Sequence, residues 1–149
     1  MQLADFIKTE SVFFRFDTAE KHAILDAMID AVCAAENIAC RDEVRQAVFE
    51  READRSTGIG RGLAVPHCRS DNVHDFHVGV AVLKNGVDWH ALDDRPVNFI
   101  FLVVGPGDKP EQYLQLLSQI SRLIRLPDAT ARLLAAGTPQ AVVKVIREL

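Results

Sequence analysis

A histidine that directly follows a proline stands at position 67 of this 149-residue chain, after a glycine-rich segment and a short apolar run. The glycine-rich segment, residues 56–62, reads STGIGRG, and Pro66 precedes His67. A proline halts the strand expected before it and so holds the next side chain at the edge of a sheet. A neutral imidazole, with an ordinary pKa of about 6.5, can act as a nucleophile near pH 7. We therefore interpret His67 as a candidate nucleophile that is suited to carrying a phosphoryl group.

Groups that could hold such a phosphoryl group precede the histidine. The hydroxyls of Ser56 and Thr57 and the backbone amides of the glycine segment, beginning at Gly58, are hydrogen-bond donors. Arg51 could bind two phosphoryl oxygens at once through its planar guanidinium. Together these groups predict an anion-binding hollow beside His67.

The sequence also leaves other interpretations of these residues open. His67 could be a packed or capping histidine, Arg51 could extend along apolar neighbours to solvent, and the glycines could only permit a tight turn. The GxGxG spacing after a predicted helix is not a dinucleotide fingerprint, and no Gly-Lys-Ser or Gly-Lys-Thr follows it as in a nucleotide P-loop. We expect no metal site, because His74 and His77 are three positions apart and would face opposite sides of a strand.

One strand and two helices are expected before the glycine segment. The apolar, aromatic run 12–16 predicts a strand, and a helical period follows it, with Asp17 or Thr18 as the cap of the helix start. A second helix is expected over residues 42–53, and Arg51 continues its inward stripe.

Residues 56–62 are expected to form a loop, because three glycines within seven residues sustain neither the helical nor the strand period. The apolar patterns that follow predict three strands and three helices. The strands are expected over residues 63–65, 76–83 and 97–104, and the helices over 111–125, over 128–136 and after Thr138 with Pro139. This order predicts an α/β fold in which helices flank a mixed β-sheet within a single domain.

Composition narrows the classes of function. The formal net charge is -4, and no stretch concentrates lysine and arginine, so we expect no nucleic-acid partner. The longest apolar runs fall well short of the roughly 20 residues that a membrane-spanning helix needs, so no membrane insertion is expected. The N-terminus lacks the layout of a secretory signal, which favours a cytoplasmic protein. The three cysteines form no CxxC pair, and we expect reduced thiols.

The run STGIGRGLAVPH, which ends at His67, resembles the signature of the type-2 IIA domains of the bacterial phosphoenolpyruvate-dependent sugar phosphotransferase system. This is the mannitol and fructose class with its nitrogen-regulatory branch. The similarity also covers the first strand and helix, Arg51, the stretch VDWHALDDRPVNFIFLVVGP and the helix LQLLSQISRL. The resemblance implies that residues 1–149 form one such IIA domain with the type-2 IIA fold.

By this resemblance, a histidine phosphocarrier like HPr would phosphorylate His67 on Nε2, and Arg51 would steady the phosphoryl group. The resemblance implies no metal and no other cofactor. Family members usually carry a second active-site histidine where this chain has Tyr113. Tyr113 could donate a hydrogen bond to a phosphoryl oxygen, but it stays neutral where a histidine could be charged. Ordinary packing on the apolar stripe of its helix is the alternative role for Tyr113.

Within the family, the chain's end at residue 149 without a sugar-binding or membrane domain favours a freestanding nitrogen-regulatory IIA protein that signals through its phosphorylation state. Regulatory targets in the family can include transporters and sensor kinases. One alternative is a sugar-specific IIA component that passes phosphate to a IIB partner. Another is a non-phosphorylated protein-interaction module, which the absence of a histidine at position 113 favours.

Overall fold

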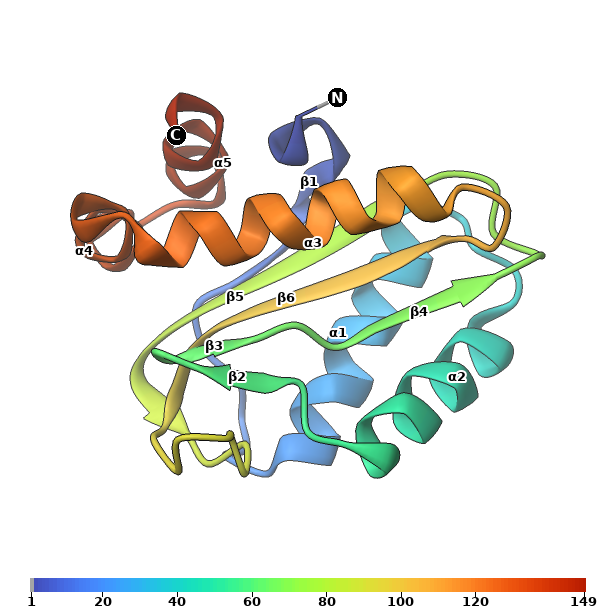
Figure 1. Cartoon of the computed structure of the whole chain (residues 1–149), viewed down its shortest axis with the longest axis horizontal. Coiled ribbons are helices and arrows are strands. Elements are labelled where there is room, and N and C mark those ends of the chain that lie inside the picture. The colour runs from blue at the N-terminus through green and yellow to red at the C-terminus, as the bar shows by residue number, and fades with distance from the viewer. Residues whose placement is uncertain (1) are drawn as a thin grey trace.

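The segment expected as a strand over residues 97–104 lies at the middle of a mixed sheet (Figure 1). This strand, β6 (Val97–Pro106), pairs antiparallel with β5 (His77–Val87). It also pairs parallel with two short strands, β3 (Leu63–Ala64) and β4 (His67–Ser70). Nine of the ten β6 residues are buried, because helices cover both faces of the sheet.

Two outer strands complete the sheet in this computed structural model, which describes residues 2–149. β1 (Ile7–Phe13) runs parallel to β5, and β2 (Gly58–Gly60) runs antiparallel to β3. The strand order is β1-β5-β6-β3-β2, with β4 beside the second half of β6. The expected mixed α/β sheet with flanking helices is therefore confirmed.

The helices form two layers with a separate hydrophobic core under each. One layer consists of α1 (Lys21–Ala35) and α2 (Arg41–Asp54). The other consists of α3 (Pro110–Arg125), α4 (Pro127–Ala135), α5 (Pro139–Glu148) and the short 3-10 helix η1 (Leu3–Phe6). Along β5, Val80 and Val82 face the core under α3, while Ala81 and Leu83 face the core under α1. Both faces of β5 are thus buried.

Several strand boundaries differ from those expected. β1 begins at Ile7, because pairing with β5 starts there, and it ends at Phe13 rather than residue 16. The segment 56–62 is not only a loop, since β2 lies within it. The chain also returns to the sheet after Pro66 as β4, a strand that the sequence did not indicate.

The start of α1 is capped by Glu20 and not by Asp17 or Thr18. The Glu20 carboxylate accepts the first free backbone N–H groups of the helix, from His22 at 3.0 Å and Ala23 at 2.7 Å. Such N–H groups have no partner within the helix, so a side-chain acceptor satisfies them. At the start of α5 the expected cap is confirmed, because the Thr138 hydroxyl accepts the Ala141 N–H at 3.1 Å.

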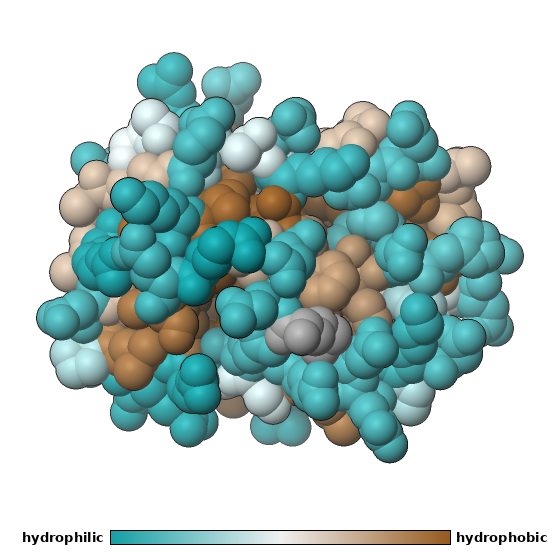
Figure 2. Space-filling view, turned by 90° about the horizontal axis from the view of Figure 1, so that it is seen from above, coloured by the Kyte–Doolittle hydropathy of each residue, from teal (hydrophilic) through white to brown (hydrophobic). Residues whose placement is uncertain are grey.

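The face that carries α3, α5 and the N-terminal end is mostly hydrophilic, with hydrophobic surface confined to separate patches (Figure 2). This distribution fits helices that turn their apolar stripes inward onto the sheet. Among residues 2–149, no helix combines the length and the apolar character that crossing a membrane requires.

Candidate functional site

The interruption between β3 and β4 sets the position of the His67 ring and determines which ring nitrogen carries the hydrogen. Ala64 pairs with Ile100 and His67 pairs with Val103, so the two strands share one register along β6 and are interrupted only at Val65 and Pro66. At this interruption the Val65 carbonyl lies 2.6 Å from Nδ1 of His67. A carbonyl oxygen can only accept, so Nδ1 must carry the hydrogen, and the lone pair of the neutral ring resides on Nε2. Nε2 is therefore the ring nitrogen with a free lone pair.

His67 lines a cleft of about 300 Å³. The walls come from the end of α2, the segment that leads into β2, the β3–β4 junction, the β5–β6 connection and α3. The lining residues are Arg51, Arg55, Ser56, Thr57, Ile59, Val65, His67, Leu92, Leu117 and Ser121. Four of the residues predicted from the sequence, at positions 51, 56, 57 and 67, thus meet in one cleft. Gly58 and Tyr113 are not part of its lining.

Arg51 lies half-buried in the last turn of α2. Its guanidinium donates to the carbonyl of Arg55, the residue that caps the helix, at 2.8 Å. This hydrogen bond uses one of the five N–H groups of the side chain and holds the group at the end of the helix. The remaining donors can serve an anion in the cleft.

The segment from Ser56 to Gly58 directs its polar groups mainly toward the protein. The Ser56 hydroxyl donates to the Trp89 carbonyl at 3.0 Å and accepts the Gly58 N–H at 3.1 Å. The Thr57 hydroxyl accepts the Trp89 indole N–H at 3.4 Å, and the Thr57 N–H donates to Glu52 at 3.0 Å. These groups therefore fix the wall of the cleft.

Tyr113 lies beside His67, in the first turn of α3. The two rings meet edge to face, with their centroids 5.7 Å apart. Tyr113 also stacks on Phe76, and the guanidinium of Arg69 lies 5.3 Å from its ring centroid. Burial raises the pKa of the Tyr113 hydroxyl above its ordinary value, so this group stays protonated and neutral. The ring of Tyr113 is thus packed among its neighbours, and the contact of its hydroxyl with a phosphoryl oxygen stays a prediction.

The environment of His67 favours the neutral ring. Burial lowers the pKa of His67 below its ordinary value, because it disfavours the charged imidazolium. The hydrogen bond to Val65 raises this pKa, the charge of Arg51 lowers it, the charge of Glu52 raises it and the charge of Arg69 lowers it, in decreasing order of effect. Near neutral pH the ring is therefore uncharged, and Arg51 and Arg69 place positive charge near it.

Sequence reasoning missed several residues of the site. Arg55 lies four positions after Arg51 and so continues the same end of α2, a spacing that could have indicated it. Leu117 and Ser121 follow Tyr113 at the helical spacing of four residues, so the stripe of α3 could have indicated them. Leu92 had no such signal, because it lies in the irregular connection between β5 and β6.

Cys68, next to His67, does not take part in the site. Successive strand residues face opposite sides of a sheet, and Cys68 is buried in the core under α1 and α2. Burial raises the pKa of its thiol to about 12, so the reactive thiolate is not populated near neutral pH. Cys68 is therefore a packing residue.

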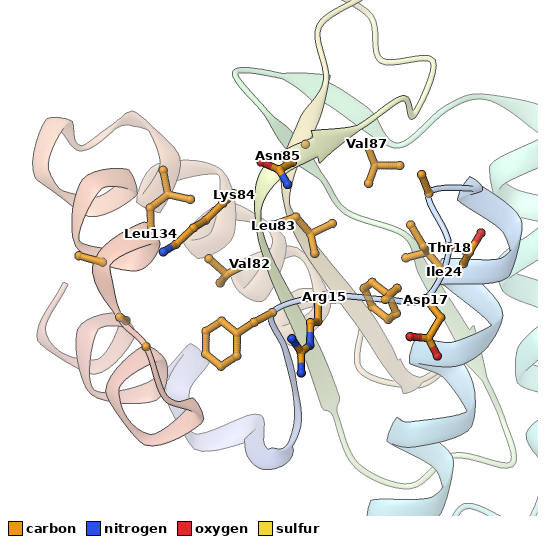
Figure 3. Close-up of a pocket in the computed structure, with 17 residues that line it drawn as sticks. Arg15, Asp17, Thr18, Ile24, Val82, Leu83, Lys84, Asn85, Val87 and Leu134 are labelled. Atoms are coloured by element: carbon orange, nitrogen blue, oxygen red, sulfur yellow. The ribbon is translucent and has the colours of Figure 1, made fainter.

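A larger cleft, of about 640 Å³, lies where the β1–α1 connection, the end of β5 and the end of α4 meet (Figure 3). Apolar side chains such as Val82 and Leu134 form much of its wall, and Arg15 and Lys84 add charge. Its 17 lining residues include neither histidine nor cysteine. The cleft at His67 is therefore the better candidate for chemistry, although it is smaller.

Known proteins resemble this chain in sequence and in fold. A family model described as "Phosphoenolpyruvate-dependent sugar phosphotransferase system, EIIA 2" matches residues 5–149. The fructose-specific EIIA component of the phosphotransferase system of Haloferax volcanii is 33% identical over 131 residues, which cover 88% of this chain and 85% of that protein. A nitrogen regulatory protein of Pseudomonas aeruginosa is 36% identical over 105 residues, 68% of each chain. The solved structure of nitrogen regulatory protein IIA-Ntr from Neisseria meningitidis shares the fold, with a TM-score of 0.88 at 20% identity, over 97% of this chain and 98% of that one.

Proposed function

Because the chain belongs to the type-2 EIIA family of the phosphoenolpyruvate-dependent sugar phosphotransferase system, we propose that His67 accepts a phosphoryl group from an HPr-like histidine phosphocarrier. The observation that carries this proposal is the 2.6 Å contact between Nδ1 of His67 and the Val65 carbonyl, which leaves Nε2 free to react. The proposal includes one domain over residues 1–149 and a cytoplasmic location.

In the proposed step, the Nε2 lone pair of His67 attacks the phosphorus of the carrier's phosphohistidine. An N–P bond forms at His67 while the carrier's N–P bond breaks, and the electron pair of the broken bond returns to the carrier's imidazole. The ring of His67 gains positive charge, which the Nδ1–H bond to Val65 stabilises. Arg51 and Arg55 line the cleft and can offset the negative charge of the phosphoryl oxygens.

We further propose that the phosphorylation state of His67 is a regulatory signal, as in the nitrogen-regulatory branch of the family. The 36% identity to the nitrogen regulatory protein of P. aeruginosa supports this branch. A phosphoryl group adds nearly two negative charges at a cleft lined by two arginines. Target proteins, such as transporters or sensor kinases, would then bind one form of the surface better than the other.

A sugar-specific role is the second candidate. The 33% identity to the fructose-specific EIIA component of H. volcanii, over 85% of that protein, favours it. In this role His67 would be the donor, and its phosphoryl group would pass to a IIB partner by the same kind of displacement at phosphorus. Adding purified IIB proteins to the phosphorylated chain separates the two roles, because rapid loss of label to one IIB protein rules against a purely regulatory role.

Labelling with radioactive phosphoenolpyruvate, the general phosphotransferase enzyme and an HPr-like carrier tests the phosphocarrier proposal. We expect acid-labile label on the wild-type protein and none on His67→Ala. His77→Ala is a matched control, because His77 is also partly buried but lies on β5 outside the cleft, so it should be labelled normally. Absence of label on the wild-type protein with every available carrier would favour a module that only binds partners.

A further inference from the structure

Glu52 is a buried acidic residue directly behind the cleft, and the phosphotransfer chemistry does not use it. It follows Arg51 in the last turn of α2, but only Glu52 of the two is buried. Arg51 reaches the cleft, whereas the side chain of Glu52 is only 2% exposed. Carboxylates are seldom buried this far without a reason, because burial removes their hydration.

The two carboxylate oxygens of Glu52 have different surroundings. Oε1 lies 2.8 Å from Nζ of Lys21, the first residue of α1, and accepts the Thr57 N–H at 3.0 Å. Oε2 is buried and has no hydrogen-bond partner within residues 2–149. An acceptor left unsatisfied in the interior costs stability, so packing alone does not explain the burial of this carboxylate.

The pair of Glu52 and Lys21 also ties together the wall of the cleft. Lys21 Nζ donates to the Trp89 carbonyl at 3.1 Å and lies 5.2 Å from the centroid of the indole ring. The same carbonyl accepts the Ser56 hydroxyl, and the indole N–H donates to the Thr57 hydroxyl. One network thus joins α1, α2 and the β5–β6 connection to the two residues that lead into β2.

The charged groups around His67 are unbalanced without Glu52. Arg51 from α2 and Arg69 on β4 both act on the ring with positive charge, and Arg55 lines the same cleft. Tyr113 from α3 stays neutral beside the ring. Arginines that hold a phosphoryl group also make the imidazole a weaker base, and phosphorylation adds positive charge to the same ring. A fixed negative charge would relieve both effects.

We propose that the Glu52 carboxylate, held by Lys21 behind the cleft, is the fixed negative charge that offsets the arginines at His67. Glu52 is in this sense a positioning residue, which acts through His67 and through the wall formed by Ser56 and Thr57. The inference rests on the proposed phosphocarrier function for its purpose. The effect of Glu52 on the His67 ring can be tested without any phosphate donor.

The test is an NMR titration of the His67 ring nitrogens in the unphosphorylated protein, with the signals assigned by comparison with His67→Ala. In Glu52→Gln the midpoint should move to lower pH, because an anion that favours the imidazolium has been removed. The amide oxygen can still accept the Thr57 N–H, so the wall should stay in place. Glu52→Asp, which keeps the charge, should restore the midpoint toward the wild-type value. Glu50→Gln is the matched control, since Glu50 is exposed on the same helix and should not move the midpoint.

Labelling of the same variants over a range of pH gives the second readout. Glu52→Gln should label about threefold more slowly than wild type above pH 7, because a less basic nucleophile reacts more slowly. The acid limb of its profile should also lie at lower pH than in wild type. A merely structural role would instead slow labelling by the same factor at every pH and leave the limb unmoved.

An unchanged His67 midpoint in folded Glu52→Gln would overturn the inference, even if wild type is labelled normally. A shifted midpoint together with no labelling of wild type would overturn the phosphocarrier function and leave the effect of Glu52 standing. If Glu52→Gln does not fold, Lys21→Met with Glu52→Gln takes its place, because replacing a buried ion pair by neutral residues is tolerated better than breaking it. The midpoint of this double variant should lie below that of Lys21→Met, which keeps the Glu52 charge, and equal midpoints in these two variants would equally overturn the inference.

Discussion

At the level of single residues, the proposed reactivity of His67 depends on one hydrogen bond. Proline cannot donate a backbone hydrogen bond, and the sheet pairing is interrupted at Val65 and Pro66. At this point the Val65 carbonyl turns to Nδ1 of His67. The tautomer is thus set in the free protein, and no reorganisation of the ring would be needed for the proposed attack by Nε2.

Replacing Tyr113 by histidine tests whether the tyrosine limits phosphorylation. Tyr113→His should be labelled as fast as wild type or faster, because a histidine at this position can carry positive charge toward the phosphoryl group. The variant should lose roughly 1–3 kcal/mol in its free energy of unfolding, since the smaller ring gives up part of the stacking on Phe76. Labelling rates and urea denaturation measure the two effects.

Tyr113→Phe is the matched control for this substitution. It keeps the edge-to-face contact with His67 and the stacking on Phe76 and removes only the hydroxyl. A clear loss of labelling in Tyr113→His would show that the tyrosine is specifically adapted. A loss of similar size in Tyr113→Phe would assign that adaptation to the hydroxyl rather than to the ring.

At the level of elements, Gly58 at the start of β2 is the tightest point near the cleft. A Cβ at this position would lie 2.7 Å from the Ala91 Cβ and 2.8 Å from its Cα, closer than such atoms can approach. Gly58→Ala should therefore push β2 away from the β5–β6 connection, which carries Leu92. We expect a loss of about 1–3 kcal/mol in the free energy of unfolding and labelling slower by roughly tenfold.

Thr138→Ala is the control for Gly58→Ala, because it tests whether a loss of stability alone slows labelling. This variant removes the cap of α5, far along the chain from the cleft, and should cost about 1 kcal/mol. Its labelling rate should equal that of wild type. If Gly58→Ala and Thr138→Ala are labelled equally fast, the position of β2 does not matter for the reaction.

The elements also show what the sequence can and cannot predict. The helices α2 to α4 lie within one or two residues of their expected bounds, because an apolar stripe repeated over several turns is a long signal. β2 and β4 have three and four residues, too few for a period to be recognised, and both depend on pairing with distant strands. At β2 the density of glycines also predicted a loop, because it sustains neither regular period.

The site was predictable where its residues flank one local motif. Arg51, Ser56, Thr57 and His67 lie within seventeen positions of one another and meet in the cleft. The role of Glu52 was not predictable. Arg51 and Glu52 are adjacent charged residues at the end of a helix, and only the tertiary structure shows which of the two is buried. Its partners, Lys21 and the Trp89 carbonyl bonded to that lysine, come from other parts of the chain.

At the level of the whole molecule, the cleft joins the two helical layers. Arg51 comes from α2, which packs on one face of the sheet, and Leu117 and Ser121 come from α3, on the other face. His67 lies at the sheet edge between them. A side chain placed in this way loses hydration when the layers close over it, so the protonation of His67 is coupled to folding of the entire molecule.

The stability of the protein should therefore fall when the pH drops from about 7.5 to 5.5. Burial holds the pKa of His67 below its ordinary value of about 6.5, and burial likewise lowers that of His77, against the opposing charge of Glu36. Between the folded and unfolded pKa values the unfolded chain binds more protons, so the free energy of unfolding rises with pH. The full stability is present above the unfolded pKa and is lost as the pH falls below it.

Urea denaturation of wild type and His67→Gln at several values between pH 7.5 and 5.5 measures this dependence. The variant should lose less stability on acidification than wild type, because one of the two buried histidines no longer titrates. The exposed carboxylates with lowered pKa values, Asp5, Glu20, Glu43 and Asp93, titrate below this range and leave the comparison undisturbed. Equal slopes for the two proteins would mean that His67 is as easily protonated in the folded state as in the unfolded chain. The packing of the two helical layers would then not be what keeps the His67 ring neutral, as attack through Nε2 requires.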